Sequence, residues 1–169
     1  MPVLRRRRRR WDEQPAHPAS VLLASDGRAQ FSSPAVERAA ELGAGSTGGP
    51  VAVVVIAKVH GTSFGLPNPG LMPTKAELKE RTDWVEGAIR DLQRRGVDAD
   101  GQVATTRRGT RLLARVARLR GVSTVVIDGT AATGIRRMVE GDPGEEIRRK
   151  LRRATGGAIT VEIIPPAGA

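Results

Sequence analysis

Short apolar runs alternate with amphipathic segments along most of this chain, and this alternation limits the fold more than any other feature. The runs are rich in Val, Ile, Leu and Ala, whereas the segments between them carry apolar residues at helical spacing. Such alternation is typical of a parallel sheet covered by helices on both faces. We therefore predict a three-layer α/β fold, with strands at residues 20–25, 51–57, 99–105, 122–127 and 158–164.

Four helices are expected between these strands. The first begins at Ser33, which we predict to be the N-cap because Pro34 suits the first helical position. The others are expected at residues 75–95, 110–120 and 143–154. A glycine follows each helix, and we predict that all four glycines adopt the left-handed conformation that ends helices; they are Gly43, Gly96, Gly121 and Gly156.

The chain divides into an arginine-rich arm, residues 1–19, and one α/β domain, residues 20–165. The net charge of +10 comes largely from six consecutive arginines in the arm; without them 22 basic residues face 18 acidic ones. Adjacent like charges repel one another, so the arm is expected to be disordered. The six arginines are Arg5, Arg6, Arg7, Arg8, Arg9 and Arg10.

The sequence lacks the residues that several classes of function need. There is no cysteine, and the only histidines, His17 and His60, have no acidic partner pattern, so neither a catalytic triad nor a histidine metal site is supported. The glycine-rich stretch 43–48 follows a helix and precedes a strand, the reverse of a dinucleotide-binding loop. No apolar run approaches the roughly 20 residues of a membrane span. We expect a cytoplasmic, soluble protein that is not an enzyme.

Two carboxylates are expected at the carboxyl ends of the strands, where open parallel sheets bind ligands. Asp26 follows the first predicted strand and Asp128 follows the fourth. Together they could hold Mg²⁺, although no third ligand is evident in the sequence. The alternative is that they are solvated and neutralised by Arg28 or Arg136.

The run Val-Leu-Leu-Ala-Ser-Asp-Gly at 21–27, the helix that contains residues 35–40, and the stretch 125–141 resemble the universal stress protein family in order and spacing. This resemblance covers roughly residues 20–164. It implies a five-stranded sheet of order 3-2-1-4-5, an aspartate at Asp26 near the adenine and ribose, and a homodimer through the last strand. Asp26 could instead accept hydrogen bonds from the turn that follows the first strand.

Nucleotide-binding members of that family carry Gly-x-x-Gly, nine residues, then Gly-Ser or Gly-Thr after the fourth strand. The matching positions are Asp128, Ala131, Gly141 and Asp142, and Gly134 lies where the family also has a glycine. Phosphate binding needs glycines and a helix N-terminus with unpaired donors. Asp142 is expected to cap the fourth helix itself, and Asp128 adds a negative charge beside the phosphates.

We therefore expect a non-catalytic stress-response or regulatory protein that requires no cofactor and binds ATP weakly or not at all. The candidate binding residues are Asp26, Gly134 and Gly141. One alternative is an adenine-nucleotide binder that uses the modified loop. Another is an electrostatic nucleic-acid or ribosome-associated factor that uses the arginine arm, together with arginines of the third and fourth helices, which could equally form a solvated basic surface; these are Arg111, Arg115, Arg118, Arg148, Arg149, Arg152 and Arg153.

Overall fold

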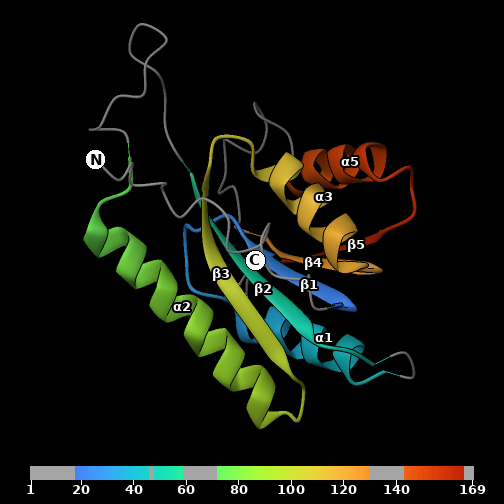
Figure 1. Ribbon diagram of the computed structural model, residues 1–169, viewed down its shortest axis with the longest axis horizontal. Helices are drawn as coiled ribbons and strands as arrows, with labels where there is room; N and C mark the ends of the chain where they lie inside the picture. The colour runs from blue at the N-terminus through green and yellow to red at the C-terminus, as the bar shows by residue number, and fades with distance from the viewer. Residues whose placement is uncertain (1–17, 46–47, 59–71, 130–142, 166–169) are drawn as a thin grey trace, which may run out of the picture.

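A single parallel sheet organises the computed structural model of the chain, which describes residues 18–45, 48–58, 72–129 and 143–165 (Figure 1). These residues form β1 (Val21–Ser25), α1 (Ser33–Gly43), β2 (Val51–Lys58), α2 (Lys75–Arg94), β3 (Ala99–Thr106), α3 (Gly109–Arg120), β4 (Thr124–Asp128), α5 (Pro143–Ala154) and β5 (Thr160–Ile164). The strand order is β3-β2-β1-β4-β5, and every pair is parallel. The predicted fold class and order are confirmed.

Helices cover both faces of the sheet, α1 and α2 on one and α3 and α5 on the other (Figure 1). Alternate residues of the central strands therefore enter two separate cores: Leu22 packs beneath α3 and α5, whereas Leu23 packs beneath α1 and α2. Both side chains are fully buried. Burial on both sides explains why β1, β2 and β4 are nearly continuous apolar runs in the sequence.

The fourth and fifth strands begin two residues later than predicted, at Thr124 and Thr160. Val122 is buried, but its backbone N–H donates to the carbonyl of Ala117 (2.9 Å), so it closes the end of α3 instead of joining the sheet. Ile159 is also buried outside the strand. Both residues are apolar because they line the core.

Three of the four predicted glycine conformations are confirmed, and one is wrong. Gly96, Gly121 and Gly156 have φ between 66° and 77°. Gly43 is the last residue of α1 and is not left-handed. It is a glycine for a steric reason: an added Cβ would lie 2.8 Å from side-chain methyls of Val51 and of Val97.

One charged side chain is buried among the described residues, that of Arg120 at the end of α3, which is 2% exposed. Its guanidinium binds both carboxylate oxygens of Asp100 on β3, with 2.7 Å between Nη2 and Oδ2. Asp100 is about half exposed, at 49%. This bidentate ion pair joins α3 to an edge strand of the sheet.

No helix within the described residues is long and apolar enough to cross a membrane. The six arginines of the arm lie within residues 1–17, outside the described part of the chain, and the boundary after residue 19 stays a prediction.

Candidate functional site

The candidate site lies where β1 and β4 end side by side. Ser25, the last residue of β1, is in register with Asp128, the last residue of β4. The chain leaves β1 toward β2 and α1 on one side, and β4 continues toward β5 on the other, so the strand order reverses here. Sheets of this class bind ligands at the carboxyl ends of such strands. The structure therefore brings the predicted Asp26 and Asp128 together at the carboxyl end of the sheet.

The carboxylate of Asp128 binds the start of α1. The backbone N–H of Ser32 donates to Oδ2 (2.7 Å), and the Ser32 hydroxyl donates to Oδ1 (2.9 Å). Ser32, not the predicted Ser33, is the N-cap of α1, and its side chain makes no capping hydrogen bond of its own. The first turn of α1 contains no acidic residue. Asp128 thus supplies a negative charge beside the positive end of the helix dipole.

Asp26 is held by its own turn. Its Oδ1 accepts the backbone N–H of Arg28 (3.1 Å), and its Oδ2 lies 3.2 Å from the Arg28 Nε. This local arrangement is the alternative that the sequence left open beside a ligand role, and both side chains are exposed enough for water to screen their charges. Of the two arginines expected to neutralise the pair of aspartates, Arg28 does so for Asp26.

Gly27 lies where β1 turns toward α1, and its backbone passes close to β2. Its φ is 76°, and an added Cβ would lie 2.3 Å from the carbonyl oxygen of Ile56. Its N–H donates to the Ser25 hydroxyl (3.2 Å), and its carbonyl accepts Arg81 Nε of α2 (3.2 Å). The Arg81 guanidinium carbon also lies 6.0 Å from the centroid of the Trp84 ring. Three elements therefore fix this turn.

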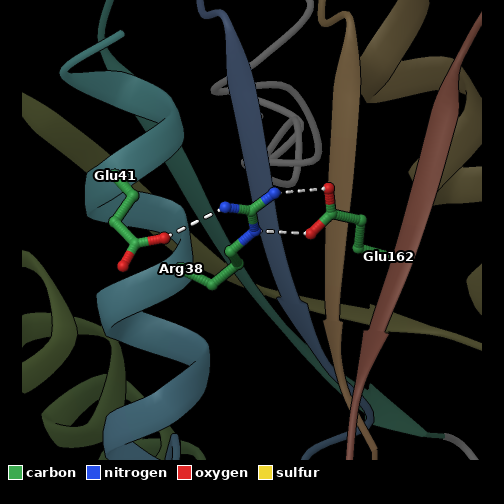
Figure 2. A network of polar contacts seen from close by, with 3 residues as sticks. All are labelled: Arg38, Glu41 and Glu162. Atoms are coloured by element: carbon green, nitrogen blue, oxygen red, sulfur yellow. Dashed lines mark hydrogen bonds and ion pairs between the residues drawn. The ribbon is translucent and has the colours of Figure 1, made fainter.

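A second polar network lies on the face of the sheet that carries α1 (Figure 2). Arg38 of α1 donates through Nε and Nη2 to the two carboxylate oxygens of Glu162 on β5 (2.7 and 3.0 Å), and through Nη1 to Glu41 (3.0 Å). The hydrogen bonds from Arg38 lower the pKa of Glu162. Because this pKa is lower in the folded than in the unfolded chain, the ion pair stabilises the fold at neutral pH, and its contribution is lost as the pH falls through the folded-state value.

The carboxylates of the site contact other parts of the chain. Both aspartates are engaged by protein donors, and no group of three potential metal ligands occurs in the described residues. The rest of the predicted motif, which includes Ala131, Gly134, Gly141 and Asp142, falls in residues 130–142 and lies outside the described part of the chain. The candidate roles of Gly134 and Gly141 stay predictions.

Sequence reasoning missed Ser32 and Arg81. Capping rules alone cannot choose between the adjacent Ser32 and Ser33, because the choice depends on Asp128, which is 96 residues away. Arg81 did leave a sign in the sequence: it occurs three residues after Leu78 and four before Val85, on the apolar stripe of its helix. A charged residue on such a stripe must reach a polar partner beside the core.

The site and sheet define an open α/β protein whose strand order reverses between β1 and β4. No protein-family model matches the sequence, and no curated protein matches it either. Solved structures are similar in fold. A protein of the universal stress protein family from Burkholderia pseudomallei is 22% identical, with a TM-score of 0.58 over 86% of this chain and 96% of that one.

Two further structures agree with this comparison. A universal stress protein from Archaeoglobus fulgidus is 13% identical, with a TM-score of 0.58 over 88% of this chain and 94% of that one. A universal stress protein in complex with cAMP is 15% identical, with a TM-score of 0.58 over 88% of this chain and 98% of that one. This chain therefore has the universal stress protein fold.

Proposed function

We propose that this protein is a divergent universal stress protein that acts in the cytoplasm as a non-catalytic regulatory or stress-response protein and binds ATP weakly or not at all. The observation that carries the proposal is the pair of hydrogen bonds between Asp128 and Ser32. A carboxylate takes the place of the first glycine of the nucleotide-binding motif, and it already occupies donors at the start of α1.

The size of the electrostatic effect supports this choice. A phosphate charge about 4 Å from an ionised carboxylate meets a repulsion of about 4 kcal/mol at an effective dielectric constant of about 20. Such a repulsion weakens binding by up to about a thousandfold. A nucleotide would also have to pull Asp128 away from Ser32, which adds to the cost.

The cAMP complex of a protein with this fold favours one second candidate, an adenine-nucleotide binder that tolerates the altered loop. In this case Asp26 would face the base and ribose, as its place at the end of β1 allows. The two candidates differ in one measurable quantity, the affinity of the unmodified protein for ATP.

Calorimetry with ATP and Mg²⁺ tests the proposal. We expect the natural chain to bind ATP with a Kd above about 1 mM, and a triple variant that restores the motif, Asp128→Gly, Ala131→Gly and Asp142→Ser, to bind at least about tenfold more tightly. Asp128→Asn serves as a control that removes the charge but leaves a side chain. Micromolar binding by the natural chain would refute the proposal, and equal affinities of the natural and restored chains would exclude these substitutions as the cause.

We also propose a homodimer through β5, the C-terminal strand. Val161 and Ile163 of the strand, and Ile159 just before it, pack in the core beneath α3 and α5. Thr160 donates its N–H toward β4, and the Ile164 carbonyl accepts from Gly129. Because parallel strands alternate, the N–H and carbonyl groups of residues 161 and 163 face the open edge, where a second copy can pair.

Sedimentation velocity checks the dimer. We expect the natural chain to sediment as a species of twice the monomer mass. Ile163→Pro is expected to shift it toward the monomer, because proline removes an outward-facing N–H donor without breaking a hydrogen bond to β4. Ile163→Val keeps that donor and is expected to leave the dimer intact. A natural chain that sediments as a monomer at all concentrations would contradict the proposal.

A further inference from the structure

The two helical layers of the protein carry different charge. On one face, α2 contains five basic and five acidic residues. On the other face, α3 contains four arginines and no acidic residue, and α5 contains five basic and two acidic residues. The surplus of positive charge in the folded domain is thus concentrated over α3 and α5, which lie side by side (Figure 1).

Cations on the first layer are largely used within the fold. Ion pairs there join Arg38 to Glu162 and Glu41, Lys79 to Asp83, Arg90 to Glu86, Arg94 to Asp91 and Arg95 to Glu37. We define the basic face as five exposed arginines of the second layer: Arg111, Arg118, Arg149, Arg152 and Arg153. No ion pair joins any of these five to a carboxylate within the described residues.

The dipole of α3 favours the arginines of its last turn but not the one in its first turn. The helix begins after Arg107 and Arg108, has no acidic residue in its first turn, and has Arg111 at a position where the helix dipole disfavours a cation. An anion bound near Arg111 would offset this unfavourable interaction with the helix dipole.

The spacing of the basic face suits an extended anion better than a small one. Arg111 and Arg118 are seven residues apart, about 10 Å along the helix axis, and packed helices such as α3 and α5 lie about 8–10 Å apart. A row of phosphates can contact several of these arginines at once. Guanidinium groups bind phosphate oxygens in pairs, as they bind carboxylate oxygens, so each arginine of the face can hold one phosphate firmly.

The described basic face is poorly suited to two other anionic partners, a membrane surface and a single-stranded nucleic acid. The apolar sides of the helices, which include Leu113, Val116 and Leu151, are buried in the core. Among the described residues of this layer, Leu119 is the one exposed large apolar side chain that a membrane would meet. The two described aromatic residues, Phe31 and Trp84, lie in the other layer. The described face therefore lacks the aromatic rings on which single-stranded bases stack best.

We propose that the basic face binds the phosphate backbones of a nucleic-acid duplex without reading its bases. Duplex binding by this face does not depend on whether ATP binds at the ends of β1 and β4. It also differs from binding by the arginine arm, because the contacts come from α3 and α5 of the folded domain. Neutralised phosphates release counterions, so the affinity must fall steeply with salt.

Fluorescence anisotropy of a labelled DNA duplex of random sequence, measured with the full chain over a salt series, tests this inference. The face variant carries Arg111→Gln, Arg118→Gln, Arg149→Gln and Arg152→Gln. The control variant carries Lys75→Gln, Lys79→Gln, Arg90→Gln and Arg94→Gln on α2, which removes the same net charge from the other layer. We expect the face variant to bind at least about tenfold more weakly and to flatten the slope of log K against log salt by about 0.9 per lost phosphate contact.

The control variant is expected to change the affinity less than about twofold, because salt screens charges on α2 from a duplex bound at the opposite layer. An arm variant, with Arg5 to Arg10 replaced by Gln, measures the contribution of the arm. Adding the face substitutions to this arm variant is expected to weaken binding by the same factor as in the natural chain. Equal losses in the face and control variants would overturn the proposal, as would face-variant affinity equal to that of the natural chain. A natural chain that prefers phosphatidylserine vesicles to the duplex would also overturn it. Circular dichroism confirms that each variant is folded.

Discussion

Gly27→Ala is expected to lower the free energy of unfolding by about 3 kcal/mol. Alanine is strained at the φ of 76° observed here, at a cost of about 1–2 kcal/mol. Its Cβ would also lie 2.3 Å from the backbone oxygen of Ile56, so β2 or the turn must move, which adds about 1–3 kcal/mol. Thermal unfolding followed by circular dichroism should show a Tm about 6–12 °C lower.

Gly121→Ala is a matched control for this prediction. Gly121 has a similar φ of 68°, but an added Cβ there would meet nothing within 4 Å. Its substitution should therefore cost only the backbone strain, about 1–2 kcal/mol. If both variants lose the same stability, the turn after β1 can move away from β2 freely, and the close approach at Gly27 has no energetic importance.

Arg120→Ala is expected to destabilise the domain by a similar amount, about 3 kcal/mol. The substitution removes a side chain that is 2% exposed, with its apolar stem, and it breaks the bidentate contact to Asp100. Loss of one partner of a buried ion pair costs about 3–5 kcal/mol, and the lower end applies because the remaining Asp100 is half exposed to water. Urea unfolding of the natural and variant chains measures the difference.

Arg118→Ala provides the control, because Arg118 belongs to the same helix turn but is exposed. An exposed substitution of this kind is expected to change stability by no more than about 0.5 kcal/mol. A double-mutant cycle with Asp100→Ala isolates the pair itself. A coupling energy near zero would show that Arg120 stabilises the fold through its packing alone.

The sheet could be predicted from the sequence because local and overall patterns agree. Buried strands such as β2 are continuous apolar runs, and the last helix, Pro143–Ala154, has the bounds that its periodicity predicted. Glycine positions supported the same division of the chain, with one error: Gly43 is small because Val51 and Val97 leave no room for a side chain. A glycine after a helix can therefore be required either for a left-handed φ or for lack of space beside neighbouring side chains.

The polar contacts of the candidate site could be predicted only in part. The strand pattern placed Asp26 and Asp128 at the carboxyl ends of the sheet, and the strand order implied by the resemblance put them on neighbouring strands. The neutralisation of Asp26 by Arg28 is a local contact that turn chemistry anticipates. The partner of Asp128 depends on how α1 lies across β4, which no local pattern encodes. Arg120 could have been found, because it follows Val116 and Ala117 on the apolar stripe of α3.

The contacts of α1 also bear on the order in which a nascent chain can complete its structure. The helix is made early in translation, but its N-cap binds Asp128, 96 residues later, and Arg38 binds Glu162, 124 residues later. Until these positions have been synthesised, the apolar side of α1 and the edge of β1 lack their final cover. Productive closure of the domain must therefore wait for almost the whole domain to emerge, and the half-made chain is the state most in need of protection from aggregation.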